Sequence, residues 1–369
     1  MLKSFFEIVK EDIKSRARLG LLNIGNYEVE TPAFVPLGSQ TDLKDAVGSE
    51  LKFWGAKMIA VDSFQLFVRP GDQMISKAGG LGPYLGFRGP VLSDAGRFRP
   101  GAGMLAFKFF ETGIFFQASG ADALRLFTPE QSIQTQINLG ADIITTLACP
   151  EQSGGKIEAR KAADFTFSWA ERAKRMFEKI KPTACTAPKI FGAVAASDIL
   201  ENIITDAAKL RELDFDGYSF TFSPDPIKTL ADLEEEKPRH LCDAAMPELI
   251  VRSIAAGIDT FDSNLPVELA QTGRLFVNMK PDGYGILDVR NKKYAQDPVP
   301  PDNTCNCYLC LHHNLSELHR LILQSDIAAK RLSVIHNFRF YFNFLEKVRR
   351  AIKYESFDDL LASYRQTET

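Results

Sequence analysis

Three cysteines lie within six residues of the stretch CNCYLCLHH: Cys305, Cys307 and Cys310, half of the six cysteines in the chain. Thiols this close together are typical of a tetrahedral zinc site, which takes four sulfur or imidazole ligands. The fourth ligand must therefore come from elsewhere in the sequence. A site with four protein ligands has no open coordination position, so it would stabilise the fold rather than take part in a reaction. The alternative is three free thiols in a loop.

Five histidines are available to complete this site: His240, His312, His313, His319 and His336. His312 and His313 follow Cys310 too closely to close a tetrahedron easily. His336 lies in SVIHNFRF, in the middle of a predicted helix that could fold back over the cysteine loop. It is therefore the most suitable of the five.

The composition indicates a globular protein: 45% of the 369 residues are hydrophobic and 25% are charged. No run of about 18 apolar residues occurs, so we expect no membrane span. The N-terminal stretch mixes acids with bases and has no small-residue cleavage site, so we expect no signal peptide. Clustered cysteines in a chain of this size indicate a reducing compartment, and we expect the cytoplasm.

The net charge of −3 argues against general coating of nucleic acids, but one segment is locally basic. Between Lys330 and Lys353 the only acid is Glu346. The bases of this segment include Arg331, Arg339, Lys347, Arg349, Arg350 and Lys353. Two interpretations stay open: a solvated helix face, or a surface that binds RNA.

Short apolar runs alternate with amphipathic helical patterns along most of the chain. We predict eight strands, in TPAFVPL, KMIAV, PVLSD, DIITTL, IFGAVA, GYSFT, HLCD and IDTFD. Helical patterns lie between most of them, for example in residues 158–180 and 196–213. Eight such units predict a (β/α)8 barrel in the α/β class, with a doubly wound open sheet as the alternative.

Two predicted hairpins interrupt this alternation. One follows the third strand and is expected to turn at Ser119 and Gly120; the other turns at Pro281-Asp282-Gly283. The linker AQDPVPPDNT then leads to the cysteines. We therefore expect a barrel core over residues 1–290 and a zinc-binding subdomain with closing helices, packed on the barrel, over residues 291–369.

The cysteine cluster, with a histidine 26 residues after Cys310, resembles the zinc site of the tRNA-guanine transglycosylase (queuine tRNA-ribosyltransferase) family. The resemblance extends over nearly the whole chain. It includes VETPAFVP, FVRPGDQMISKAGGLGPYLGFRGPVLSDAGRF, LFTPEQSIQTQINLGADI, LRELDFDGY, EEEKPRHL, AAGIDTFDSNLP and VIHNFRFYFNFLEKVRRAI. It implies a (β/α)8 barrel with one structural Zn²⁺ per chain on Cys305, Cys307, Cys310 and His336.

The resemblance also implies the chemistry. Enzymes of this family exchange a guanine in tRNA for a 7-deazaguanine base on the route to queuosine, through a covalent aspartate–ribose intermediate. Asp262 matches the nucleophile and Asp94 the second catalytic aspartate. Phe98 matches the aromatic residue against which the base stacks. The basic closing helix, with Arg339, Lys347, Arg349, Arg350 and Lys353, is compatible with binding tRNA.

Other positions depart from the family pattern. Ala148, Ala195, Thr221 and Phe222 stand where the family places the base-recognising aspartate, the glutamine and a Gly-Gly pair. The family's DSGG motif reads DAGR here, with Ala95 and Arg97, and an arginine expected near Glu268 is missing. Each lost hydrogen-bonding partner in such a pocket costs about 1–3 kcal/mol of binding. The guanine pocket is therefore expected to be lost.

Two functions fit this pattern. The first is a non-catalytic subunit that binds tRNA and pairs with a catalytic relative, as a homodimer or heterodimer. The second is an active enzyme that accepts a different base, and the retained Asp94 and Asp262 favour it. A barrel recruited to an unrelated hydrolysis or binding function is the third alternative.

Overall fold

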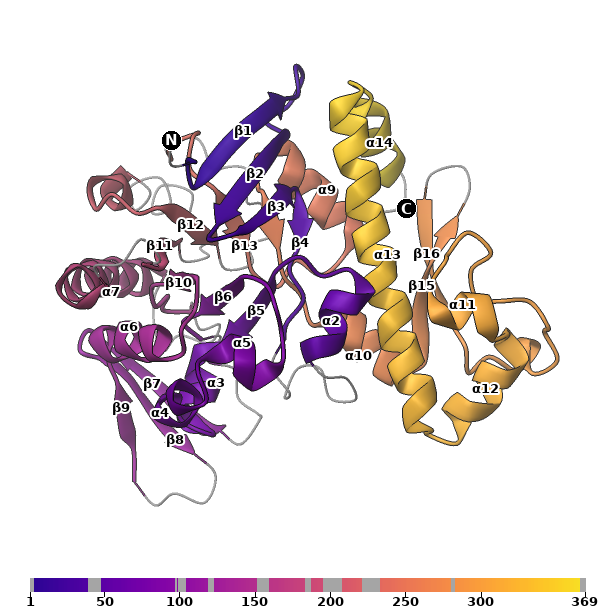
Figure 1. Ribbon diagram of the computed structural model, residues 1–369, viewed down its shortest axis with the longest axis horizontal. Coiled ribbons are helices and arrows are strands. Elements are labelled where there is room, and N and C mark those ends of the chain that lie inside the picture. The colour runs from indigo at the N-terminus through magenta and orange to yellow at the C-terminus, as the bar shows by residue number, and fades with distance from the viewer. Residues whose placement is uncertain are drawn as a thin grey trace.

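The computed structural model describes residues 3–38, 48–96, 98, 104–118, 123–150, 159–182, 187–194, 208–220, 233–279 and 283–365. Its centre is a sheet of eight parallel strands surrounded by helices (Figure 1). In hydrogen-bonded order these strands are β4 (Ala33–Phe34), β14 (Thr260–Phe261), β13 (Arg239–Leu241), β12 (Gly217–Phe220), β11 (Lys189–Val194), β10 (Ile143–Thr145), β6 (Val91–Asp94) and β5 (Ile59–Asp62). Each of the eight predicted strands corresponds to one of them.

The sheet closes on itself into a barrel. A parallel bridge joins Leu37, just after β4, to Ala60 of β5. Around it, the Ala60 amide donates to Pro36 O at 3.0 Å and the Gly38 amide donates to Ala60 O at 2.7 Å. Neighbours in space follow the chain order, whereas a doubly wound sheet would reverse it. The predicted (β/α)8 barrel is confirmed, and the open-sheet alternative is wrong.

Successive residues of the barrel strands face opposite sides. Ile59, Val61 and Val91 pack in the core between the sheet and its helices. Ala60 and Leu92, which alternate with them, pack inside the barrel instead. Residues of the same parity nearer the carboxyl ends of the strands therefore also face the barrel axis.

The helices around the barrel include α2 (Gly48–Trp54), α3 (Ser63–Val68), α4 (Asp72–Lys77), α5 (Leu81–Leu85), α6 (Pro129–Asn138), α7 (Ala159–Ile180), α9 (Pro247–Ala255) and α10 (Leu265–Gln271). Helix α7 confirms the pattern predicted over residues 158–180. Of the helix predicted over 196–213, residues 196–207 lie outside the described part, and residues 208–212 are helical. No helix among the described residues is long and apolar enough to cross a membrane.

Three antiparallel sheets accompany the barrel. Strands β1 (Phe6–Glu11), β2 (Arg18–Ile24) and β3 (Tyr27–Thr31) form a sheet that we did not predict. Its apolar side chains include Leu22, Ile24 and Val29, which pack with the barrel interior. Because those side chains cover the interior, the sheet excludes water from one end of the barrel.

The insertion after the third barrel strand is a three-stranded sheet of β7 (Met104–Phe110), β8 (Gly113–Ala118) and β9 (Arg125–Phe127). The predicted hairpin corresponds to β8 and β9, which pair antiparallel, whereas the additional strand β7, joined to β8 by a turn at Glu111 and Thr112, was not predicted. Ser119 and Gly120 lie outside the described residues. The second hairpin is confirmed as β15 (Arg274–Met279) and β16 (Gly283–Asp288), although its Pro281 and Asp282 are not described.

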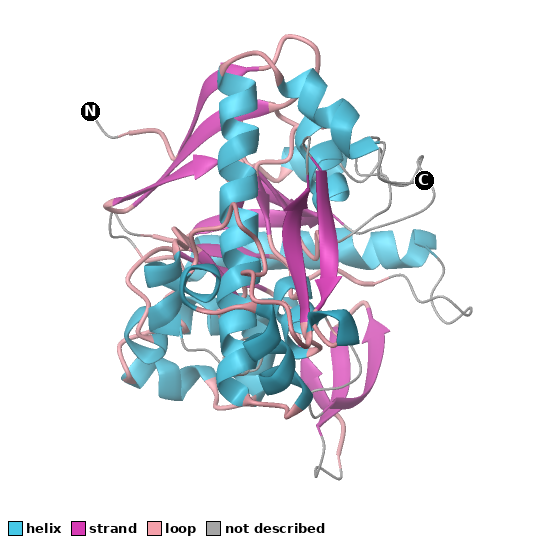
Figure 2. Ribbon diagram, turned by 90° about the vertical axis from the view of Figure 1, so that its right-hand side faces the viewer, coloured by secondary structure: helices cyan, strands magenta, loops and turns pink. Residues whose placement is uncertain are grey.

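The last part of the chain contains η2 (Lys292–Tyr294), α11 (Tyr308–His312), α12 (Leu315–Leu323), α13 (Ile327–Lys353) and α14 (Phe357–Arg365). Helix α13 runs between the barrel and the hairpin β15–β16 (Figures 1 and 2). Its buried face shares one apolar core with the barrel. The domain boundary at residue 290 stays a prediction.

A buried ion pair holds the first sheet against the barrel. Arg18 of β2 donates from Nε and Nη2 to the two carboxylate oxygens of Asp259, at 2.8 and 2.7 Å. The side chains are only 4% and 0% exposed. Asp259 Oδ2 also accepts from the backbone amide of Arg239, at 2.8 Å. The pair therefore connects β2 to the starts of β13 and β14.

Removing one partner of this pair tests its contribution. Arg18→Met should lower the free energy of unfolding by about 3–5 kcal/mol, because the Asp259 carboxylate stays buried without its countercharge. Arg18→Lys keeps the charge but cannot donate to both carboxylate oxygens in the same way, so its free energy of unfolding should lie between those of the wild type and Arg18→Met. Urea denaturation followed by circular dichroism measures both. The matched control is Lys14→Met, which removes an exposed pair with Asp358 and should leave stability nearly unchanged. Equal stabilities of Arg18→Met and Lys14→Met would contradict the argument.

Candidate functional site

The carboxyl ends of the barrel strands carry a group of inward-facing polar side chains. Strand parity places them on the barrel axis, beyond the apolar interior. They are Asp62, Asp94, Ser219, His240, Cys242, Thr260 and Asp262, all at least nine-tenths buried. Active sites of (β/α)8 barrels form at this end. Asp94 and Asp262, predicted from the sequence, therefore lie at the same mouth of the barrel.

The Asp262 carboxylate follows β14 and is fully buried. One oxygen, Oδ1, accepts a hydrogen bond from the backbone amide of Asp243 at 2.9 Å. The other, Oδ2, lies 3.2 Å from His240 Nε2, and His240 is itself fully buried. The second ring nitrogen, Nδ1, lies 3.0 Å from Thr260 Oγ1. Both oxygens of the predicted nucleophile are thus held by the protein.

Asp94 ends β6 and is 9% exposed. Its Oδ1 accepts from the Gly96 amide at 3.2 Å, and Ser63 Oγ donates to its backbone carbonyl at 2.8 Å. In the strand register Asp94 pairs with Asp62, whose carboxylate caps helix α3 by accepting from the Gln65 amide. Asp62 therefore has a structural role at the same rim.

Phe98, the predicted stacking residue, lies inside a cluster of phenylalanines. Its ring centroid is 5.1 Å from that of Phe64 and 5.8 Å from that of Phe107, in edge-to-face arrangements. The side chain is only 7% exposed. A Cβ at Gly96 would lie 2.8 Å from the Phe98 ring, so glycine is required there for this packing. Phe98 thus fills the core between the barrel mouth and the sheet β7–β9.

The other predicted base-pocket positions are only partly described. Ala148 follows β10 and is half-buried, and its methyl group can form no hydrogen bond. Next to it, burial raises the pKa of the Cys149 thiol to about 12, so this thiol stays protonated. Ala195, Thr221 and Phe222 lie outside the described residues, as does Arg97. Glu268 lies in the first turn of α10 and accepts from Asn264 Nδ2 at 3.2 Å.

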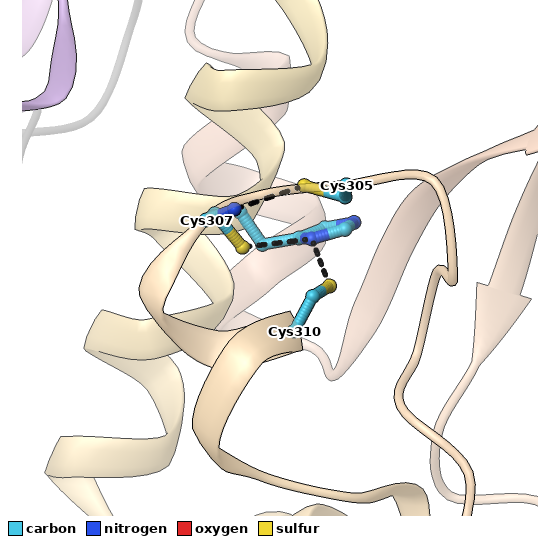
Figure 3. A group of neighbouring side chains, drawn as sticks. Cys305, Cys307 and Cys310 are labelled. Carbon is cyan, nitrogen blue, oxygen red and sulfur yellow. Dashed lines mark hydrogen bonds between the residues drawn. The ribbon is translucent and has the colours of Figure 1, made fainter.

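The three cysteines of the C-terminal region converge on one point (Figure 3). The ligand atoms of Cys305, Cys307, Cys310 and His336 all lie within 4.8 Å of one another, and all four residues are buried. His336 Nδ1 is 3.4 Å from the sulfur of Cys307 and 3.2 Å from that of Cys310. Hydrogen bonds from Cys305 and Cys310 lower the pKa of Cys307 to about 3, and hydrogen bonds with the other two sulfurs together with burial raise the pKa of Cys310. This donor set fits a tetrahedral metal ion.

A second contact orients the histidine for this purpose. His336 Nε2 lies 2.7 Å from the backbone carbonyl of Phe276 in β15. A carbonyl only accepts, so Nε2 carries the proton and the lone pair of Nδ1 points at the sulfurs. Such an outer hydrogen bond is the usual companion of a metal-binding imidazole. The next residue, Asn337, accepts from the Phe276 amide at 3.0 Å and fixes the same strand.

The predicted tRNA-binding residues of α13 differ in their surroundings. Lys347, Arg350 and Lys353 are exposed, and Arg339 is half-buried. Arg349 instead turns inward: its Nη1 donates to Pro32 O at 2.7 Å, and burial lowers the pKa of its guanidinium. Arg349 therefore connects α13 to the segment before β4.

Two residues of the barrel mouth were missed in the sequence. Cys242 was predicted only as part of the strand HLCD, and His240 was considered only as one of five possible ligands for the cysteine cluster. The signal was present: residues two apart in a strand face the same side, so H-x-C at a strand end presents two ligand-type side chains together. Without the strand neighbours, nothing indicated that Asp262 would lie beside them.

Comparison with known proteins agrees with this geometry. The sequence profile described as queuine tRNA-ribosyltransferase matches residues 12–369. A queuine tRNA-ribosyltransferase of Thermoanaerobacter pseudethanolicus is 32% identical over 359 residues, which cover 94% of this chain and 93% of the relative. Similar relatives of the same name occur in Desulforudis audaxviator (31% identity, 96% of each chain) and Vibrio campbellii (31% identity, 98% of this chain and 96% of the relative).

The packing of Phe98 leads to a testable distinction. Phe98→Ala should lower the free energy of unfolding by about 3–5 kcal/mol, because it opens a cavity in a packed aromatic cluster. Removing a ring that served only as an exposed stacking platform would lower the free energy of unfolding far less. Phe53→Ala is the matched control, since Phe53 is 89% exposed. Urea denaturation of both variants measures the difference, and equal midpoints would show that Phe98 does not pack as described.

Proposed function

The chain belongs to the queuine tRNA-ribosyltransferase family. We propose that it binds tRNA in queuosine modification without exchanging the base efficiently on its own. The observation that carries this proposal is the state of Asp262. A nucleophilic carboxylate must reach the anomeric carbon of its substrate. Here the carboxylate is fully buried, with one oxygen held by the Asp243 amide and the other beside His240.

The base-binding positions support the same proposal. The family resemblance expects an aspartate at Ala148 and an exposed aromatic face at Phe98. The alanine offers no hydrogen bond, and the phenylalanine ring is packed against Phe64 and Phe107. A site that recognises a purine edge loses orders of magnitude in discrimination with each such contact. The alternative, an active enzyme with a different base preference, rests on the retention of Asp94 and Asp262 at one barrel mouth.

The basic face of α13 is the proposed tRNA-binding surface. Arg339, Lys347, Arg350 and Lys353 fall within an arc of about 120° on the helix, at 3.6 residues per turn. Phosphate contacts dominate the affinity of such surfaces for nucleic acid. Arg349 is assigned to the fold rather than to tRNA, because its guanidinium already binds Pro32 O.

The surface of the C-terminal region supports the proposal of a partner chain. Four large apolar side chains there are 58–67% exposed: Tyr308, Leu311, Leu323 and Ile327. Exposed apolar side chains in one region are typical of protein–protein contact surfaces. We propose that they contact a second subunit, either another copy of this chain or a catalytic relative.

We propose that the Cys3His cluster holds one structural zinc ion per chain and that the protein works in the cytoplasm. Three thiolates with one imidazole form a common structural zinc set. The described cysteines Cys149, Cys242, Cys305, Cys307 and Cys310 are all free of disulfides. Free thiols are expected in a reducing compartment such as the cytoplasm.

Loss of one ligand should release this zinc. Cys307→Ser should lower the zinc bound at the Cys3His cluster from one per chain to nearly none and lower the melting temperature, because metal binding stabilises this loop on α13. Metal analysis by mass spectrometry and thermal denaturation measure both effects. Cys149→Ser, at a buried cysteine far along the chain from this cluster, is the control and should keep the zinc. Unchanged zinc content in Cys307→Ser would rule out the cluster as its site.

Charge reversal tests the tRNA surface. Replacing Lys347, Arg350 and Lys353 by glutamate should weaken tRNA binding at least tenfold and reduce its salt dependence, because fewer counterions are released. All tRNA species should be affected alike, since phosphate contacts carry no sequence information. The matched control reverses three exposed cations of α7: Lys161, Arg175 and Lys179. Equal weakening by both sets would attribute the effect to net charge alone.

Base exchange tests the catalytic proposal. The protein alone should incorporate little labelled guanine into tRNA, under conditions where a catalytic relative is active on the same preparation. Exchange at a rate near that of the relative, abolished by Asp262→Ala, would favour the enzyme with altered base preference. The protein is also mixed with the catalytic relative. If this mixture were no more active than the relative alone and the two proteins formed no complex, the subunit proposal would fail.

A further inference from the structure

We propose that His240, Cys242 and Asp262 form a second metal site, at the mouth of the barrel, for a divalent ion of the zinc type. The three ligand atoms lie within 4.8 Å of one another. The residues are 0%, 4% and 0% exposed. By mutual distance and burial this group matches the Cys3His cluster of the C-terminal region, yet it lies at the ends of barrel strands, whereas that cluster lies on a loop, α11 and α13.

The strand register explains why these side chains meet. His240 of β13 pairs with Thr260 of β14, and Leu241 pairs with Phe261. Leu241 and Phe261 face the surrounding helices, so the flanking residues face the barrel axis. Cys242 and Asp262 are the next inward-facing positions beyond His240 and Thr260. The four side chains therefore form a compact patch on two adjacent strands, with its ligand atoms at the carboxyl ends.

The charges of the group favour a divalent cation. A fully buried carboxylate such as Asp262 is costly without a countercharge. An imidazole and a thiol lie beside this carboxylate. One carboxylate, one thiolate and one neutral imidazole balance a divalent ion without excess charge. Zinc takes this combination of ligands at 2.0–2.3 Å.

The observed distances suit this arrangement. Two ligands of a tetrahedral zinc ion lie about 3.3–3.8 Å apart, given the usual bond lengths. His240 Nε2 and Asp262 Oδ2 are 3.2 Å apart, so a small outward shift admits the ion. The Asp243 amide holds Oδ1 of the same carboxylate at 2.9 Å, which leaves Oδ2 to serve as a single-oxygen ligand.

Outer contacts orient the other two ligands. His240 Nδ1 lies 3.0 Å from Thr260 Oγ1, so a proton on Nδ1 can be donated there while Nε2 binds the ion. Ser219 Oγ lies 3.5 Å from the Cys242 sulfur. With three ligands from the described part of the chain, the fourth position is open to water or a small anionic ligand, unlike the closed Cys3His cluster. This site does not depend on the proposed tRNA function.

Metal content of the full-length protein tests the site without tRNA. Protein saturated with zinc and freed of excess by gel filtration should contain two zinc ions per chain. Cys242→Ser should retain one, and Cys307→Ser should retain the other. Cys149→Ser, at a buried cysteine outside both clusters, should retain two. Cobalt loading should add a thiolate-to-cobalt absorption band that Cys242→Ser reduces in part.

A second variant keeps the test decisive if Cys242→Ser folds poorly. Thr260→Val leaves all three ligands in place but removes the partner of His240 Nδ1. It should lower the zinc affinity of the barrel-mouth site about 10–100-fold, measured in competition with a chelator, and leave the affinity of the Cys3His cluster unchanged. One zinc per chain in the wild type, with no change in Cys242→Ser or Thr260→Val, would overturn the proposal. Because metal content is measured without tRNA, this outcome is separate from any failure of the tRNA-binding proposal.

Discussion

The ring of eight parallel strands is the constraint on which the other features depend. The bridge between Leu37 and Ala60 closes this ring, so all carboxyl ends of the strands meet at one mouth. Parity then decides which side chains face the axis: apolar ones in the interior and polar ones at the rim. Asp94 and Asp262 are far apart in sequence, and the closed ring alone brings them to the same mouth. The same parity brings His240 and Cys242 beside Asp262.

Strand β14 illustrates how the barrel accommodates charge. Its two residues, Thr260 and Phe261, are flanked by Asp259 and Asp262, and both carboxylates are fully buried. Neither could be buried without compensation. At one end Asp259 receives the guanidinium of Arg18, which also fixes the sheet β1–β3 to the barrel. At the other end Asp262 receives the Asp243 amide and the imidazole of His240. The first arrangement fixes architecture, whereas the second has the ligand types that bind metals.

The sequence was sufficient for the barrel because strand periodicity and helix amphipathicity are local signals. It was insufficient for β1–β3, whose role depends on long-range packing of Leu22 and Val29 over the barrel interior. The cysteine spacing predicted a metal cluster, and the fold brings His336 to it. Phe98 matched a stacking residue, but only its neighbours reveal that the ring is buried. Likewise the sequence predicted Arg349 to be a surface cation, whereas in the fold its guanidinium donates to Pro32 O. In each case the missing information was the identity of the contacting residues, which a single sequence does not contain.

Helix α13 connects the cysteine cluster to the basic face proposed to bind tRNA. In its first half, His336 reaches the cysteine loop and the Phe276 carbonyl, while Asn337 Nδ2 donates to Pro266 O at 2.9 Å. Adjacent residues of one turn thus join the cysteine cluster, the hairpin β15–β16 and helix α10 of the barrel. In its second half, the same helix presents Lys347 and Arg350 to solvent. A continuous helix packed on the barrel over most of its length is a rigid element, so its two halves keep a fixed relative orientation. A metal ion at the cysteine cluster would therefore fix the orientation of the basic face relative to the barrel mouth, although it lies far from that face along the helix.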